Sequence, residues 1–131
     1  MFVFRLDARS GVPPYLQLVQ QVKQAFLLGF LESGDRLPLI REVVESLAIN
    51  PNTVAKAYRQ LEQEGVVTGR PGQGTFVTAA PSARVSPATY TSLRRGMESW
   101  LRRAYAAGLD EEAVTALFST THHDMKAEGA A

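Results

Sequence analysis

A helix with marked ends, residues 50–65, constrains the fold more than any other stretch of the chain. Asn50 is a residue type that caps the free N–H groups of a first helical turn, and Pro51 suits the first helical position because it has no N–H to leave unpaired. Gly65 is placed to end the helix in a left-handed turn. Apolar residues recur between these ends at helical spacing: Val54, Ala57, Tyr58 and Leu61. The pattern predicts an amphipathic helix whose apolar stripe, Tyr58 included, faces a core.

The other face of this predicted helix carries amides, a hydroxyl and two cations. Such groups hydrogen-bond to base edges and to phosphates. The polar residues that we take as candidate DNA contacts are Asn50, Asn52, Thr53, Lys56 and Arg59. An alternative for the two cations stays open, because both could be solvated on an ordinary surface helix, with Glu62 as a pairing partner for Arg59.

Two further helices are expected before this one. The first spans about residues 15–31, with Phe30 on its apolar stripe. The second spans about residues 39–47, with Ile40 inward and Arg41 outward as another candidate DNA contact. Two short helices joined by a tight turn, of which the second is rich in base-contacting side chains, have the layout of a helix-turn-helix.

The chain changes from helical to β-like periodicity after Gly65. Residues 66–68 and 75–78 favour strands, and the loop between them holds glycines and a proline that permit a tight turn. A hairpin directly after a helix-turn-helix is a wing. The wing, together with the turn before the second helix, adds these candidate DNA contacts: Arg36, Arg70, Gly72, Gln73 and Gly74. The opening run Phe2–Leu6 also favours β structure, so we expect it to form a third strand on this sheet.

Beyond the wing, residues 79–85 are rich in small residues and are expected to form a linker. The linker separates a winged helix-turn-helix DNA-binding domain, residues 1–78, from a helical segment, residues 86–131. This segment is predicted to form a hairpin of two helices, at about residues 87–107 and 111–127. The expected fold class is therefore mainly α, with a small antiparallel β-sheet in the wing.

The predicted helical hairpin is too short to bury both of its apolar stripes alone. Pairing two hairpins into a four-helix bundle would cover them, so we expect a homodimer. The predicted dimerisation residues are Tyr90, Leu93, Met97, Trp100, Leu101, Leu117 and Phe118. The alternative is that the hairpin folds back on its own winged domain. A cavity of about 300 Å³ or more is not expected within so short a subunit, so a small-molecule effector, whose identity is unknown, would bind at an interface.

Composition argues against several other classes of protein. The 131-residue chain has no cysteine, which rules out disulfides and thiolate chemistry. It has no apolar run of about 18 residues and no secretion-signal pattern at its start, so we expect a cytoplasmic protein without a membrane partner. The net charge is only +1, so a case for nucleic acid must rest on a local surface. The cations lie toward the helix starts and the wing tip, whereas Glu62 and Glu64 lie at the far end of the third helix.

Catalytic and metal-binding patterns are missing from the sequence. His122 and His123 are neighbours, so they point in different directions on a helix, and they lack a third ligand at helical spacing. The glycines of the wing precede a strand rather than Lys-Ser or Lys-Thr and a helix, which argues against a nucleotide-binding loop. We therefore predict no metal site, no cofactor and no enzymatic activity.

Several short motifs follow one another between residues 12 and 77. They are Pro14-Tyr15, Gly34-Asp35-Arg36-Leu37-Pro38, Arg41-Glu42-Val43, Asn50-Pro51-Asn52-Thr53-Val54, Ala57-Tyr58, Leu61-Glu62-Gln63-Glu64-Gly65 and Gly72-Gln73-Gly74-Thr75-Phe76-Val77. Together they resemble the GntR family of bacterial transcriptional regulators. The resemblance implies that Arg41 and the first turns of the third helix meet phosphates and the major groove, and that the wing tip enters the minor groove. The short helical extension is similar to that of the YtrA subfamily, whose members are usually dimers, often associated with control of transporter operons.

We therefore expect a homodimeric, sequence-specific transcriptional regulator, most simply a repressor, that binds double-stranded DNA. The two-fold symmetry of a homodimer would require an inverted-repeat operator. The alternative is a protein–protein adaptor that uses the helical hairpin and binds no DNA. A salt titration separates the two, because DNA affinity falls steeply as salt rises.

Overall fold

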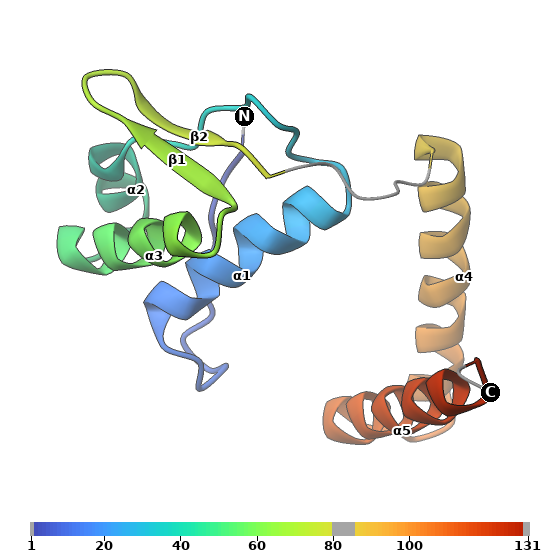
Figure 1. The fold of residues 1–131 in the computed structure, drawn as a ribbon. Coiled ribbons are helices and arrows are strands. Elements are labelled where there is room, and N and C mark those ends of the chain that lie inside the picture. The colour runs from blue at the N-terminus through green and yellow to red at the C-terminus, as the bar shows by residue number, and fades with distance from the viewer. Residues whose placement is uncertain (1, 80–85, 130–131) are drawn as a thin grey trace. The chain divides into compact units, whose positions relative to one another are not determined.

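The computed structural model describes residues 2–79 and 86–129, which are coloured in Figure 1. These residues belong to two units, one within residues 1–85 and one within residues 86–131. The predicted linker, residues 79–85, lies outside the described residues apart from Ala79. Within the described ranges, no helix is both long and apolar enough to cross a membrane.

The first unit is a three-helix core with a β-hairpin, which can be followed in Figure 1. Its elements follow in the order α1 (Pro14–Leu27), α2 (Ile40–Leu47), α3 (Pro51–Gln63), β1 (Val67–Arg70) and β2 (Gly74–Val77). Both α1 and α2 pack against α3. The most deeply buried side chains come from α1, the segment before α2, α3 and the hairpin: Leu18, Val19, Val22, Leu37, Val54, Leu61, Val67 and Val77. This winged helix-turn-helix and its small antiparallel sheet confirm the predicted fold class.

The α1 helix ends earlier than its apolar pattern predicts. It stops at Leu27, and Gly29 follows in a left-handed conformation with φ 84°. The backbone N–H groups of Phe30 and Leu31 both donate to the carbonyl of Ala25, at 2.8 and 3.1 Å, which closes the helix end. The resulting turn brings Leu31 into the core, whereas Phe30, which we expected to face inward, is 62% exposed.

The α2 helix begins at Ile40 rather than at Leu39. Leu39 lies at the N-cap, where its backbone N–H donates to the Glu42 carboxylate at 2.9 Å. Ile40 was expected inward but is 37% exposed, and Val43 is the fully buried residue of this helix. Ala48 ends α2 in a left-handed conformation, with φ 55° and ψ 45°.

The α3 helix has the ends and the buried face that the sequence predicts. The Asn50 side chain accepts the Asn52 N–H at 2.8 Å, and Pro51 is the first helical residue. Gly65 follows the helix with φ 78°. The whole predicted stripe, Val54, Ala57, Tyr58 and Leu61, is buried. One face of α3 is therefore committed to the core.

The third member of the small sheet is not the N-terminal run. β1 and β2 pair antiparallel with Val67 opposite Val77, and the other edge of β2 is taken by the segment before α2. Arg36 forms a β-bridge with Phe76, the Leu37 N–H donates to Thr75 at 2.8 Å, and the Val77 N–H donates to Asp35 at 2.8 Å. The prediction of a strand at Phe2–Leu6 is therefore wrong.

The run Phe2–Leu6 is extended but lies against α1, where two glutamine side chains satisfy its backbone. The Gln21 amide accepts the Arg5 N–H at 2.8 Å and donates to the Arg5 carbonyl. One turn earlier, the Gln17 amide accepts the Asp7 N–H at 2.9 Å and donates to the Asp7 carbonyl at 3.0 Å. These side chains replace a neighbouring strand, and Phe4 enters the core at 4% exposure.

The second unit consists of α4 (Pro87–Ala106) and α5 (Glu111–Gly129). Ser86 caps α4 by accepting the Thr89 N–H at 3.2 Å, and Asp110 accepts the Ala113 N–H at 2.8 Å at the start of α5. The buried residues of this unit, Ala104 and Val114, lie beside the turn that joins the helices. Away from the turn, α5 runs across the direction of α4 (Figure 1). The predicted two helices are present, but most of their apolar surface is not covered within one chain.

Candidate nucleic-acid interface

The start of α3 presents polar side chains on the side opposite its buried stripe. Asn52, Lys56 and Arg59 are exposed, and Thr53 is half-buried. Because Asn52, Lys56 and Arg59 follow one another at steps of four and three residues, they lie on one face of the helix. The Asn50 side-chain oxygen differs from these groups, since it accepts the Asn52 N–H and caps the helix. The amide N–H groups of Asn50 remain available to donate to a partner.

Tyr58 fixes α3 against the segment that leads into α2. Its ring is 6% exposed, and its hydroxyl donates to the Pro38 carbonyl at 2.6 Å. Burial raises the pKa of the Tyr58 hydroxyl, and the nearby Glu42 carboxylate raises it further. Arg41 is exposed and is the second residue of α2. The partly buried Tyr58 hydrogen bond therefore sets where the start of α2, with Arg41, lies relative to α3.

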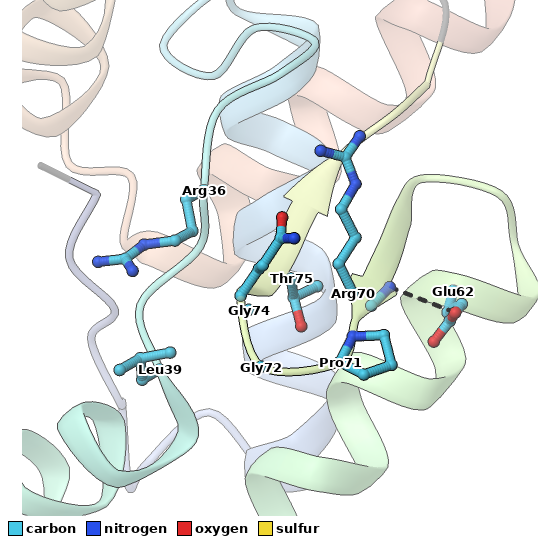
Figure 2. Close-up of a pocket in the computed structure, with 10 residues that line it drawn as sticks. Arg36, Leu39, Glu62, Arg70, Pro71, Gly72, Gly74 and Thr75 are labelled. Carbon is cyan, nitrogen blue, oxygen red and sulfur yellow. Dashed lines mark hydrogen bonds between the residues drawn. The ribbon is translucent and has the colours of Figure 1, made fainter.

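The wing and the segment before α2 enclose a shallow hollow of about 580 Å³. Figure 2 shows Arg36 on one side of it and Arg70 on the other, with the glycine turn between them. Gly72 and Gly74 have φ values of 75° and 123°, a region that side chains disfavour. A Cβ atom on Gly74 would also lie 3.2 Å from Cδ of Arg36. Glycine at position 74 thus lets the wing approach Arg36 closely.

The carboxylates near the end of α3 have partners of their own. Glu62 was considered as a partner for Arg59, but its carboxylate accepts the Gly69 N–H at 3.3 Å, as the dashed line in Figure 2 shows. Glu64 forms an ion pair with Lys23 at 2.7 Å, the one such pair among the described residues. The hydrogen bond from Lys23 lowers the pKa of Glu64, with a smaller contribution from Gln60. These acids therefore do not neutralise the cations at the start of α3.

Two of the predicted contact cations lie over aromatic rings. The Lys56 Nζ is 3.9 Å from the centroid of the Tyr15 ring, and the Arg70 guanidinium carbon is 4.7 Å from the centroid of Phe76. The helix predicted from about residue 15 gives no indication that the Tyr15 ring lies under a lysine of another helix, so sequence reasoning missed this contact. The only available signal was the short motif Pro14-Tyr15, because the spacing of residues on one helix does not reveal what a second helix places above them.

Comparison with known proteins gives the family. The pattern described as "Bacterial regulatory proteins, gntR family" matches residues 14–77. The HTH-type transcriptional repressor YtrA of Bacillus subtilis (strain 168) is 32% identical over 124 residues, which cover 95% of each chain. The chain belongs to the GntR family. Since the likeness to YtrA extends through the C-terminal helices, the chain groups with the YtrA-like members of the GntR family.

Two solved structures have a similar fold. YtrA from Sulfolobus acidocaldarius, a GntR-family transcription factor, is 30% identical with a TM-score of 0.55, over 80% of this chain and 99% of that one. The DNA-binding domain of AraR, solved in complex with the operator ORE1, is 23% identical with a TM-score of 0.50, over 60% of this chain and 95% of that one. GntR-family proteins are DNA-binding transcriptional regulators rather than enzymes, and this chain is one of them.

The second unit of this GntR-family chain carries an open apolar groove of about 580 Å³ between α4 and α5. Its lining includes five of the predicted dimerisation residues: Leu93, Met97, Trp100, Leu117 and Phe118. The other two, Tyr90 and Leu101, are half-buried outside this lining. Within a single chain Leu93 is 64% exposed, Met97 54% and Phe118 50%. A soluble protein rarely leaves so many large apolar side chains uncovered on one face.

Proposed function

We propose that this GntR-family regulator is a homodimeric repressor that binds an inverted-repeat operator. The observation that carries the proposal is the arrangement of the first unit, where the start of α3, α2 and the tip of the β1–β2 hairpin lie along one side (Figure 1). This side bears cations and amides at its surface, while Glu62 accepts the Gly69 N–H and Glu64 pairs with Lys23. The fold is also that of the AraR domain, which was solved on its operator.

The proposed roles follow from the position of each side chain. The start of α3 enters the major groove, which is about 12 Å wide and accepts a helix. Asn52 and Thr53 reach base edges there, while Arg41, Lys56 and Arg59 bind phosphates. The glycine turn at the wing tip carries Arg70 and Gln73 toward the minor groove, and Arg36 contacts the backbone beside it. Asn50 chiefly holds the helix start, since its side-chain oxygen is already bonded.

Homodimerisation is proposed through the apolar groove between α4 and α5. A second copy of the groove offers apolar side chains that would cover Leu93, Met97 and Phe118, each at least half exposed in one chain. Two copies related by a two-fold axis present two α3 helices in opposite directions. The operator is then an inverted repeat with half-site centres about 10–10.5 base pairs, or a multiple of that, apart.

Repression is proposed because YtrA of Bacillus subtilis, which is similar over almost its full length, carries the name of a repressor. The resemblance to the YtrA subfamily suggests a transporter operon as the set of regulated genes. Selection of bound fragments from genomic DNA, followed by a reporter assay on the recovered promoter, tests both statements. Reporter expression that falls when the protein is absent would contradict repression.

A salt titration of operator binding tests the DNA contacts. The logarithm of affinity should fall by about 0.9 per neutralised phosphate as the logarithm of salt concentration rises. Arg41→Ala should weaken binding by about tenfold or more, because hydrogen bonds to charged groups contribute about 1.5–3 kcal/mol, and should reduce the salt slope by about 0.9. Arg95→Ala, an exposed arginine on α4, is the matched control. If the wild-type protein does not bind any DNA duplex specifically, the adaptor alternative is favoured.

The dimer is tested by a single charge placed in the groove. Met97→Glu should give a monomer in sedimentation equilibrium and should lose most operator affinity, because an unpaired carboxylate would be buried between the two copies. Since Met97 is 54% exposed in one chain, the monomer should still fold. Arg95→Glu on the same helix lies outside the groove lining and should remain a dimer. A dimeric Met97→Glu protein would place the interface elsewhere.

A further inference from the structure

Two cations of the proposed DNA face are held by aromatic rings rather than by carboxylates. The described residues contain two cation–π contacts, Lys56 over Tyr15 at 3.9 Å and Arg70 over Phe76 at 4.7 Å. The one ion pair among the described residues, by contrast, joins Lys23 to Glu64 at the other end of α3. The aromatic partners therefore lie at the start of α3 and on the wing, whereas the carboxylate partner lies at the end of α3.

The kind of partner determines how much charge a cation can offer to a phosphate. A carboxylate neutralises its cation and must be displaced before a phosphate can bind. An aromatic ring attracts a cation through its quadrupole but carries no net charge, so the cation keeps its full charge. Lys56 remains exposed while it lies over Tyr15. The contact thus restricts the flexible lysine side chain without neutralising it.

Restriction before binding has a thermodynamic consequence. A lysine that moves freely in the unbound protein loses rotamer entropy when a phosphate fixes it. Contact with the Tyr15 ring removes part of that freedom in advance. Tyr15 is the second residue of α1, is half-buried, and comes from a different helix than Lys56. It can therefore direct the lysine from outside the helix that enters the groove.

We propose that Tyr15 is a positioning residue, which holds the Lys56 ammonium over its ring and ready for a DNA phosphate. Phe76 positions the Arg70 guanidinium in the same way at the wing. The proposal rests on the proposed DNA-binding function, and it adds the first turn of α1 to the operator interface. The ring face is the active feature, so the Tyr15 hydroxyl is not required for it.

The test is a double-mutant cycle on the full-length protein, measured as affinity for the operator fragment recovered by selection. Tyr15→Leu should weaken binding by about two- to fivefold, which is part of the affinity that immobilising one flexible side chain costs. Tyr15→Phe keeps the ring and should bind like the wild type. In a Lys56→Ala background, Tyr15→Leu should have no further effect.

Other outcomes separate the possible failures. If Tyr15→Leu weakens binding equally with and without Lys56, Tyr15 acts through packing alone and the proposal is overturned. Loss of affinity in Tyr15→Phe would likewise overturn it, because the hydroxyl would then be the contact. If Tyr15→Leu lowers the thermal midpoint, Tyr15→Met supplies a second ringless variant for the cycle. Wild-type protein without salt-dependent duplex binding would refute the proposed function itself, before any variant is compared.

Discussion

Tyr58→Phe provides the sharpest test of how the two helices of the helix-turn-helix are held together. The substitution keeps the buried ring, which is 6% exposed, and removes the 2.6 Å hydrogen bond to the Pro38 carbonyl. A lost bond that leaves a partly buried carbonyl unpaired costs about 1–2 kcal/mol. We expect the free energy of unfolding to fall by this amount.

The assay is chemical denaturation followed by circular dichroism at a fixed protein concentration, because the proposed dimerisation would make stability depend on concentration. Tyr105→Phe is the matched control, since Tyr105 is 50% exposed and belongs to α4. Removal of the exposed Tyr105 hydroxyl should change the free energy of unfolding by less than about 0.5 kcal/mol. Equal stability of Tyr58→Phe and the wild type would refute the assignment of this bond as a structural tie.

The same pair of proteins gives a prediction about pH. The pKa of Tyr58 is raised in the folded chain above its ordinary value of about 10, first by burial and then by Glu42. Above about pH 10, the Tyr58 hydroxyl loses its proton in the unfolded chain and keeps it in the folded chain, so the free energy of unfolding falls as pH rises. The stability advantage of the wild type over Tyr58→Phe should therefore be complete below pH 10 and should shrink above it, by up to about 1.4 kcal/mol per pH unit. An advantage that stays constant between pH 9 and 11 would contradict the raised pKa.

Three backbone predictions concern stability and are measured by thermal unfolding. Asn50→Ala removes the cap on the Asn52 N–H and should lower stability by about 1 kcal/mol; no change would mean that water caps α3 equally well. Ala48→Gly relieves a left-handed alanine with φ 55° and should raise stability by about 0.5–1 kcal/mol. A lower stability would show that the added entropy of the unfolded chain outweighs this relief. Gly74→Ala combines φ 123° with a 3.2 Å approach to Arg36, so it should lower stability by about 1 kcal/mol or more, whereas a neutral result would indicate that the wing adjusts freely.

Elements with chemical signals at their ends were predictable from sequence. Asn50, Pro51 and Gly65 mark α3, and Ser86 and Asp110 mark the helices of the second unit, because capping depends on residues close in sequence. The end of α1 was not predictable in the same way. Apolar residues continue past Leu27 with helical spacing, and the pattern does not show that Gly29 turns the chain so that Leu31, and not Phe30, enters the core.

The N-terminal run shows what a periodic pattern can and cannot establish. The alternation was physically real, since Phe4 is buried while Val3 and Arg5 are exposed. The predicted pairing with the hairpin was wrong, because amide side chains on α1 form the backbone hydrogen bonds that we expected a neighbouring strand to form. The candidate site has the same limit. Single-helix spacing placed Asn52, Lys56 and Arg59 on one face, but the ring beneath Lys56 comes from another helix.

The bond from the Gly69 N–H to Glu62 has a further consequence for the proposed operator. Together with the Val66 N–H, which donates to Leu61 at 2.9 Å, it joins the end of α3 to the first strand of the hairpin. The α3 helix and the wing are therefore held at a fixed distance from each other. One base pair inserted inside a half-site would shift the minor groove by about 3.4 Å along the duplex. Half-site length should thus be as strictly selected as half-site sequence.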